Sequence, residues 1–78
     1  MTEKREITFE IVKHLALLST SQNGWKKELN IVKWNGGNEK FDIREWDENH
    51  ERMSKGITLK EDEARLIAES ILEHLEEA

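Results

Sequence analysis

Aromatic and basic residues gather in one stretch of the chain, residues 25–59. The stretch holds all three tryptophans, Trp25, Trp34 and Trp46, and seven of the twelve basic residues. The seven are Lys26, Lys27, Lys33, Lys40, Arg44, Arg52 and Lys55. Indole rings stack on nucleobases and basic side chains neutralise phosphates, which together bind single strands with little regard for sequence. These residue types predict a surface for single-stranded nucleic acid if the fold brings them to one side.

Other chemistry has no support in the sequence. The chain has no cysteine, which excludes thiolate zinc sites, disulfides and cysteine nucleophiles. Its three histidines, His14, His50 and His74, lack the spacing of a helical zinc motif. Residues 47–58 are a poor match to a calcium-binding loop, because Arg52 and Thr58 stand where that loop needs a glycine and an acid. We therefore expect no catalytic residue, no metal, no cofactor and no small-molecule substrate.

The net charge of −5 argues at first against a nucleic-acid ligand. The excess acid is local, however. Residues 57–78 carry two basic residues against seven acidic ones, whereas residues 25–56 carry seven of each. Because salt screens fields over roughly 8 Å, a face formed by residues 25–56 can be basic while the whole chain is acidic.

The central stretch has the pattern of a β-hairpin. Apolar and polar residues alternate over Trp25–Trp34 and over Glu39–Trp46. Between them lies Asn35-Gly36-Gly37-Asn38, and Asn-Gly supplies the positive φ that a tight hairpin turn needs. Alternation places Lys40, Asp42, Arg44 and Trp46 on one face of the second strand, opposite Phe41 and Ile43. Lys33 falls on the Leu29 side of the first strand if that strand is regular, and a bulge near the turn would reverse it.

The flanking segments complete a small sheet and a helix. Ile7–Ser19 fits both a helical and a strand pattern, and its β-branched residues favour a strand. In the strand reading, Phe9, Ile11, Leu15 and Leu17 share one face. Lys55–Leu59 predicts a short fourth strand, and Glu61–Glu77 predicts a helix. Its apolar stripe consists of Ala64, Ile67, Ala68, Ile71, Leu72 and Leu75.

Seventy-eight residues predict one domain, which we place at residues 1–78. A core of this size is marginal by itself, so we expect a homodimer. The longest apolar run, Leu15–Leu18, is too short for a membrane span, and residues 1–24 lack the apolar core of a signal peptide. We expect a cytoplasmic protein without a membrane partner.

Two segments resemble a known family. Phe41-Asp42-Ile43-Arg44-Glu45-Trp46 and Lys55-Gly56-Ile57-Thr58-Leu59, joined by a polar loop and followed by a helix, resemble the C-terminal domain of the transcriptional coactivator positive cofactor four. Residues 24–30, with Trp34-Asn35, are most similar to its bacterial YdbC-like branch. The resemblance implies an α+β fold, a curved four-stranded antiparallel sheet followed by a C-terminal helix in the order β-β-β-β-α. It also implies a homodimer whose groove binds single-stranded DNA with little sequence preference.

The resemblance also implies roles for individual residues. Arg44 matches an arginine that contacts the DNA backbone, and Lys55 matches a lysine central to binding. Lys33 matches a basic residue late in the first hairpin strand. Trp34 and Trp46 fall near aromatic residues of the family's binding surface. The turn Asn35–Glu39 departs from the family because it lacks two lysines found there.

The turn leaves Lys40 as the nearest cation. With Lys26 and Arg52 added for their charge and position, the candidate nucleic-acid-binding set is Lys26, Lys33, Trp34, Lys40, Arg44, Trp46, Arg52 and Lys55.

Several alternatives stay open at this point. Trp34 and Trp46 can each stack on a base or pack in the core. RNA is an alternative ligand, since stacking and phosphate contacts need not distinguish the sugar. The biological role can lie in transcription, replication or repair. A different class of function is an acidic dimeric module that docks a protein partner in transcription.

Overall fold

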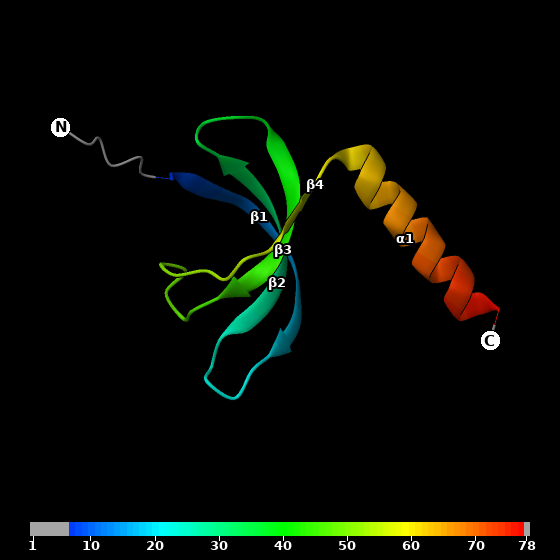
Figure 1. The fold of residues 1–78 in the computed structure, drawn as a ribbon, viewed down its shortest axis with the longest axis horizontal. Helices are drawn as coiled ribbons and strands as arrows, with labels where there is room; N and C mark the ends of the chain where they lie inside the picture. The colour runs from blue at the N-terminus through cyan, green and yellow to red at the C-terminus, as the bar shows by residue number, and fades with distance from the viewer. Residues whose placement is uncertain (1–6, 78) are drawn as a thin grey trace.

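The computed structural model describes residues 7–77, which form a four-stranded antiparallel sheet followed by one helix (Figure 1). In order along the chain, and side by side in the sheet, lie β1 (Phe9–Thr20), β2 (Lys26–Trp34), β3 (Glu39–Trp46) and β4 (Ile57–Leu59). The helix α1 (Glu61–Glu76) follows. The predicted α+β class and the order β-β-β-β-α are confirmed. Residues 1–6 and 78, which the predicted domain includes, lie outside the described residues.

The turn between β2 and β3 has the geometry that its sequence predicts. Asn35 and Gly36 both have positive φ, 51° and 72°, as the two central residues of a type I′ turn do. The Gly37 N–H donates to the Trp34 carbonyl at 2.8 Å and closes the turn. This turn twists in the same sense as the strands, so β2 and β3 pair without a register shift from Lys26–Trp46 to Lys33–Glu39.

The first strand is bulged along its whole length. Its twelve residues pair with the nine of β2 through three register shifts, and Val12, Leu15 and Leu18 have no partner in the ladder. Bulges bend a strand and increase its twist. The strand assignment for this segment is confirmed. Phe9, Ile11 and Leu17 share one face as predicted, because they pair with Trp34, Val32 and Glu28 of β2, whereas the prediction is wrong for Leu15. The extra residues shift the alternation, and Leu15 falls at a bulge.

The sheet is strongly curved, and its two faces differ. The strand ends bend toward one side, which the segment between β3 and β4 crosses, while α1 leaves on the other side (Figure 1). We call the concave side the inner face. It carries the buried residues Glu28, Asn30, Val32, Asp42 and Trp46. Val32 and Trp46 are 0% exposed and form the centre of a small core under the 47–56 segment.

The helix packs little against its own sheet. Glu63 accepts a hydrogen bond from the Lys60 N–H at 2.9 Å, and acidic residues fill the first turn, which suits the positive end of the helix dipole. No residue of α1 is buried. Its large apolar side chains are 41–64% exposed; they are Leu66, Ile67, Ile71, Leu72 and Leu75. Within residues 7–77, no helix has both the length and the hydropathy needed to cross a bilayer.

The link into β4 depends on a glycine. A β-carbon at Gly56 would collide with the Ile43 carbonyl oxygen and with Cβ of Arg44. We expect Gly56→Ala to lower the free energy of unfolding by about 1–3 kcal/mol, because β4 must move off β3 to admit the methyl group. Denaturant unfolding measures this loss. Gly36→Asn is the control, since no atom of the described part of the chain lies within 4 Å of a β-carbon there and asparagine tolerates positive φ. Equal losses in both variants would contradict the prediction.

Candidate nucleic-acid interface

Three of the predicted binding residues line one hollow on the inner face. The hollow has a volume of about 520 Å³, within the range of ordinary ligand sites. Its lining consists of Ile7, Trp34, Asn35, Arg44, Met53, Ser54, Lys55 and Thr58. We call it the inner hollow. It brings an indole, a guanidinium and an ammonium group together from β2, β3 and the segment before β4.

Arg44 is held by a buried carboxylate. Its Nε donates to Asp42 Oδ1 at 2.7 Å, and its Nη2 donates to Oδ2 at 2.8 Å. Asp42 is 0% exposed, and the Arg44 side chain is 12% exposed. Thr58 on β4 adds a hydrogen bond to Asp42 Oδ2 at 3.1 Å. The pair therefore joins β3 to β4 and fixes the direction of the guanidinium.

The guanidinium lies over an indole ring. The Cζ atom of Arg44 is 4.5 Å from the centroid of the Trp34 ring, a distance typical of a cation–π contact. Phe9 lies 5.9 Å from the same ring and 5.1 Å from the ring of Trp46. The His50 ring lies 5.6 Å from the ring of Trp46. The four rings therefore form a row in the order Trp34, Phe9, Trp46 and His50. Trp34 is half-buried and reaches the inner hollow from one end of the row.

The burial of Trp46 in this row of rings determines its role. Its ring is fully buried, so it packs in the core and offers no surface to a base. The sequence left stacking and packing open for this residue. The structure removes Trp46 from the candidate interface and retains Trp34.

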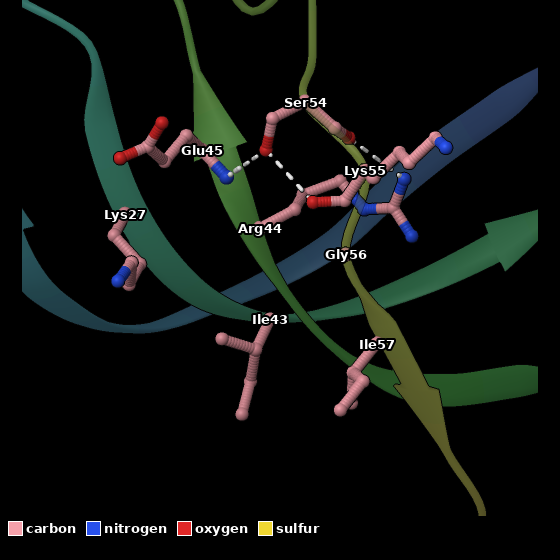
Figure 2. Close-up of a pocket in the computed structure, with 8 residues that line it drawn as sticks. All are labelled: Lys27, Ile43, Arg44, Glu45, Ser54, Lys55, Gly56 and Ile57. Atoms are coloured by element: carbon pink, nitrogen blue, oxygen red, sulfur yellow. Dashed lines mark hydrogen bonds between the residues drawn. The ribbon is translucent and has the colours of Figure 1, made fainter.

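Residues 53–55 form a ridge that carries Lys55 between two hollows. Ser54 fixes the ridge to β3: its N–H donates to the Glu45 carbonyl, and its Oγ accepts from the Glu45 N–H, both at 3.0 Å. Figure 2 shows the Lys55 amine and the Arg44 guanidinium directed to the same side of the ridge. Ile43 and Ile57 point away from them.

The second hollow lies on the other side of the ridge and includes Lys27 (Figure 2). Lys27 is not in the candidate set, because the alternation of β2 gives no sign that residues 53–55 lie close to it.

The remaining predicted cations do not line the inner hollow. By register, Lys26 lies opposite Trp46 and Lys40 opposite Val32, so both belong to the inner face, and both are exposed. Lys33 pairs with Glu39 on the outer face, as a regular strand requires. Arg52 is exposed on the segment that crosses the inner face. The structure thus gathers Trp34, Arg44 and Lys55, leaves Lys26, Lys40 and Arg52 exposed outside the inner hollow, and places Lys33 on the opposite face of the sheet.

A second polar cluster lies farther along the inner face. Glu28 is only 5% exposed, and both of its carboxylate oxygens lie 3.0 Å from His50 Nε2. Asn30 donates to Glu28 Oε1 at 3.0 Å, and His14 Nδ1 lies 2.8 Å from Asn30 Oδ1. Together with Ile11, these residues line a third hollow. The sequence gave no sign of this cluster, because its members come from β1, β2 and the 47–56 segment.

The environment of Glu28 favours its charged form. Burial by itself would raise the pKa of this carboxyl, but hydrogen bonds from Asn30 and His50 and the charge of the two histidines outweigh burial. The pKa of Glu28 therefore falls below its ordinary value of 4.5. The cluster anchors the 47–56 segment to β2 through His50. Among residues 7–77, no group of three or more histidine or acidic side chains has the arrangement of a metal site.

Comparison with known proteins agrees with this geometry. The family model described as Transcriptional Coactivator p15 (PC4) matches residues 21–70, from the loop before β2 into α1. The chain belongs to the PC4 family. Members of the PC4 family bind nucleic acid, and the matched residues include all three groups of the inner hollow that the resemblance predicted. The chain is also similar to an uncharacterized protein of Treponema pallidum (strain Nichols), a bacterial relative 47% identical over 51 residues. The matched region covers 65% of this chain and 60% of that relative.

The Glu28 cluster predicts a pH dependence of stability. A carboxylate whose pKa is lowered by folding stabilises the fold above its ordinary pKa, and this contribution is lost as the pH falls through the folded value. We expect stability to decline below pH 4.5, the ordinary pKa of the group. Glu28→Gln should lower the free energy of unfolding by about 1–3 kcal/mol at neutral pH and should flatten the acid decline.

Denaturant unfolding from about pH 7 to about pH 3 measures both effects. Glu51→Gln, at an exposed position of the 47–56 segment, is the control and should behave as the wild type. An acid decline of the same steepness in Glu28→Gln and in the wild type would show that Glu28 does not cause it.

Proposed function

We propose that this chain is a homodimeric, sequence-tolerant single-stranded DNA-binding protein that acts as a coactivator-like factor in transcription. The observation that carries the proposal is the inner hollow, where an indole ring and two basic groups from three segments meet in a chain of a nucleic-acid-binding family. A base stacked on an aromatic ring contributes about 1–3 kcal/mol, and this contact tolerates any base. Lys55 supplies a cation within the same hollow for the phosphate beside that base.

The charge distribution supports the same ligand. Lys26 and Lys40 lie on the inner face with Lys55, while the acidic helix leaves from the opposite side of the sheet (Figure 1). The helix therefore does not cover the inner hollow. Its charge is separated from the basic groups by the sheet, and salt weakens what remains over such a distance.

The apolar stripe of α1 supports a homodimer. Five large apolar side chains stay exposed on one sixteen-residue helix, and isolated helices of that length are marginal in water. A second copy offers an identical stripe, so two helices can bury their apolar faces against each other. Because α1 lies on the side away from the inner hollow, this pairing leaves both inner hollows open.

Binding assays test the proposed ligand. Fluorescence anisotropy with single-stranded DNA, duplex DNA and single-stranded RNA, in salt from about 50 to 200 mM, should show that single-stranded DNA binds more tightly than duplex. Affinity should fall with salt, since bound phosphates release counterions. Lys55→Ala should weaken binding and lower the slope of log K against log salt by about 0.7, the value for one phosphate on a single strand.

The control is Lys13→Ala, because Lys13 pairs with Ile31 on the outer face. It should bind as the wild type does. If the wild type binds no nucleic acid even at low salt, the proposal fails, and a module that docks a protein through its acidic helix becomes the better explanation.

Solution mass tests the dimer. Ile71→Glu combined with Leu75→Glu places two charges in the apolar stripe and should convert the dimer to a monomer, as light scattering would show. Glu69→Gln, at an exposed position of the same helix, should leave the mass unchanged. A wild type that is monomeric across the accessible concentration range would refute this part of the proposal.

A further inference from the structure

The guanidinium of Arg44 has little hydrogen-bonding capacity left for a ligand. It has five N–H groups. Nε and Nη2 donate to the two oxygens of Asp42, and Nη1 lies 3.4 Å from the Ser54 carbonyl and 3.5 Å from Met53 Sδ. One face of the group lies on the Trp34 ring. Only 12% of the side chain is exposed.

Its charge is also balanced within the chain. Asp42 is fully buried, and Arg44 is its ion-pair partner. A phosphate that drew Arg44 away would leave the Asp42 carboxylate unpaired in the core, with the Thr58 hydroxyl as its one remaining side-chain hydrogen-bond donor among residues 7–77. Removing one member of a buried ion pair is strongly unfavourable. The lysines on the inner face carry no comparable constraint, since Lys26, Lys40 and Lys55 are all exposed.

What Arg44 does contact is the rest of the binding surface. It covers one face of Trp34, and it bonds to Met53 and Ser54 directly before Lys55. Without it, the indole ring would lose the group above it, and the ridge would lose one of its attachments to β3.

We propose that Arg44 is a positioning residue: paired with Asp42, it holds the Trp34 ring and the 53–55 ridge in place, while lysines, Lys55 first among them, neutralise the phosphates. This inference rests on the proposed binding of single-stranded DNA. It differs from the role implied by the resemblance, in which the matching arginine contacts the DNA backbone.

Salt dependence separates the two roles. The double variant Asp42→Asn/Arg44→Gln keeps the size of both side chains and removes both charges, so no buried charge is left unpaired. If Arg44 is a positioning residue, this variant should keep the wild-type slope of log K against log salt with a thymidine oligonucleotide. Arg44→Gln alone should weaken binding at least tenfold, because Asp42 is then unpaired, and Asp42→Asn should restore most of that loss. Lys55→Gln is the matched comparison and should lower the slope by about 0.7.

A second measurement is made on the wild-type protein, so it does not depend on whether the double variant folds. The side-chain Nε–Hε signal of Arg44 in a ¹H–¹⁵N NMR spectrum, assigned by its loss in Arg44→Gln, reports the bond to Asp42. It should keep its position when the wild type is saturated with the oligonucleotide.

A double variant whose slope falls as far as that of Lys55→Gln, or an Arg44 signal that moves on binding, would overturn the inference and leave the proposed function intact. If the double variant does not fold, the NMR signal decides alone. A wild type that does not bind the oligonucleotide would overturn the proposed function itself, and the inference with it.

Discussion

The buried carboxylate of Asp42 is the constraint on which the inner face depends. A charge with no exposed surface must be paired, and Arg44, two residues along the same strand face, is the partner within reach. The pair also takes a hydrogen bond from Thr58, so β4 is fixed against β3 although it is only three residues long. One ion pair thus sets the position of the guanidinium, of the indole below it and of the strand beside it.

Curvature makes this arrangement possible in so short a chain. The three bulges of β1 bend the sheet until its ends face each other, and the 47–56 segment fills the concave side (Figure 1). Trp46 can then be fully buried by a loop and a neighbouring strand. The core therefore has few members. The indole N–H groups of Trp34 and Trp46 are buried, and neither has a hydrogen-bond partner among residues 7–77.

Features encoded within a few residues could be predicted from sequence, and features that depend on the path of the chain could not. The Asn35–Gly36 turn and the helix follow from local backbone chemistry, and both were predicted correctly. The pattern of β1 looked ambiguous because one bulge in every three residues gives an apolar period between those of strand and helix. Whether Trp46 is buried depends on which face the 47–56 segment crosses. The contact of Glu28 with His50 joins residues 22 apart, and no spacing rule links them.

The weak attachment of α1 has a consequence for how the chain folds. Since none of its residues is buried and the sheet touches it chiefly through β3, the sheet can form while the helix is still unstructured. Whatever covers the apolar stripe then supplies most of the helical stability. If a second copy covers it, helix content, read from circular dichroism, becomes a measure of protein concentration, and dilution melts the helix before it disturbs the strands.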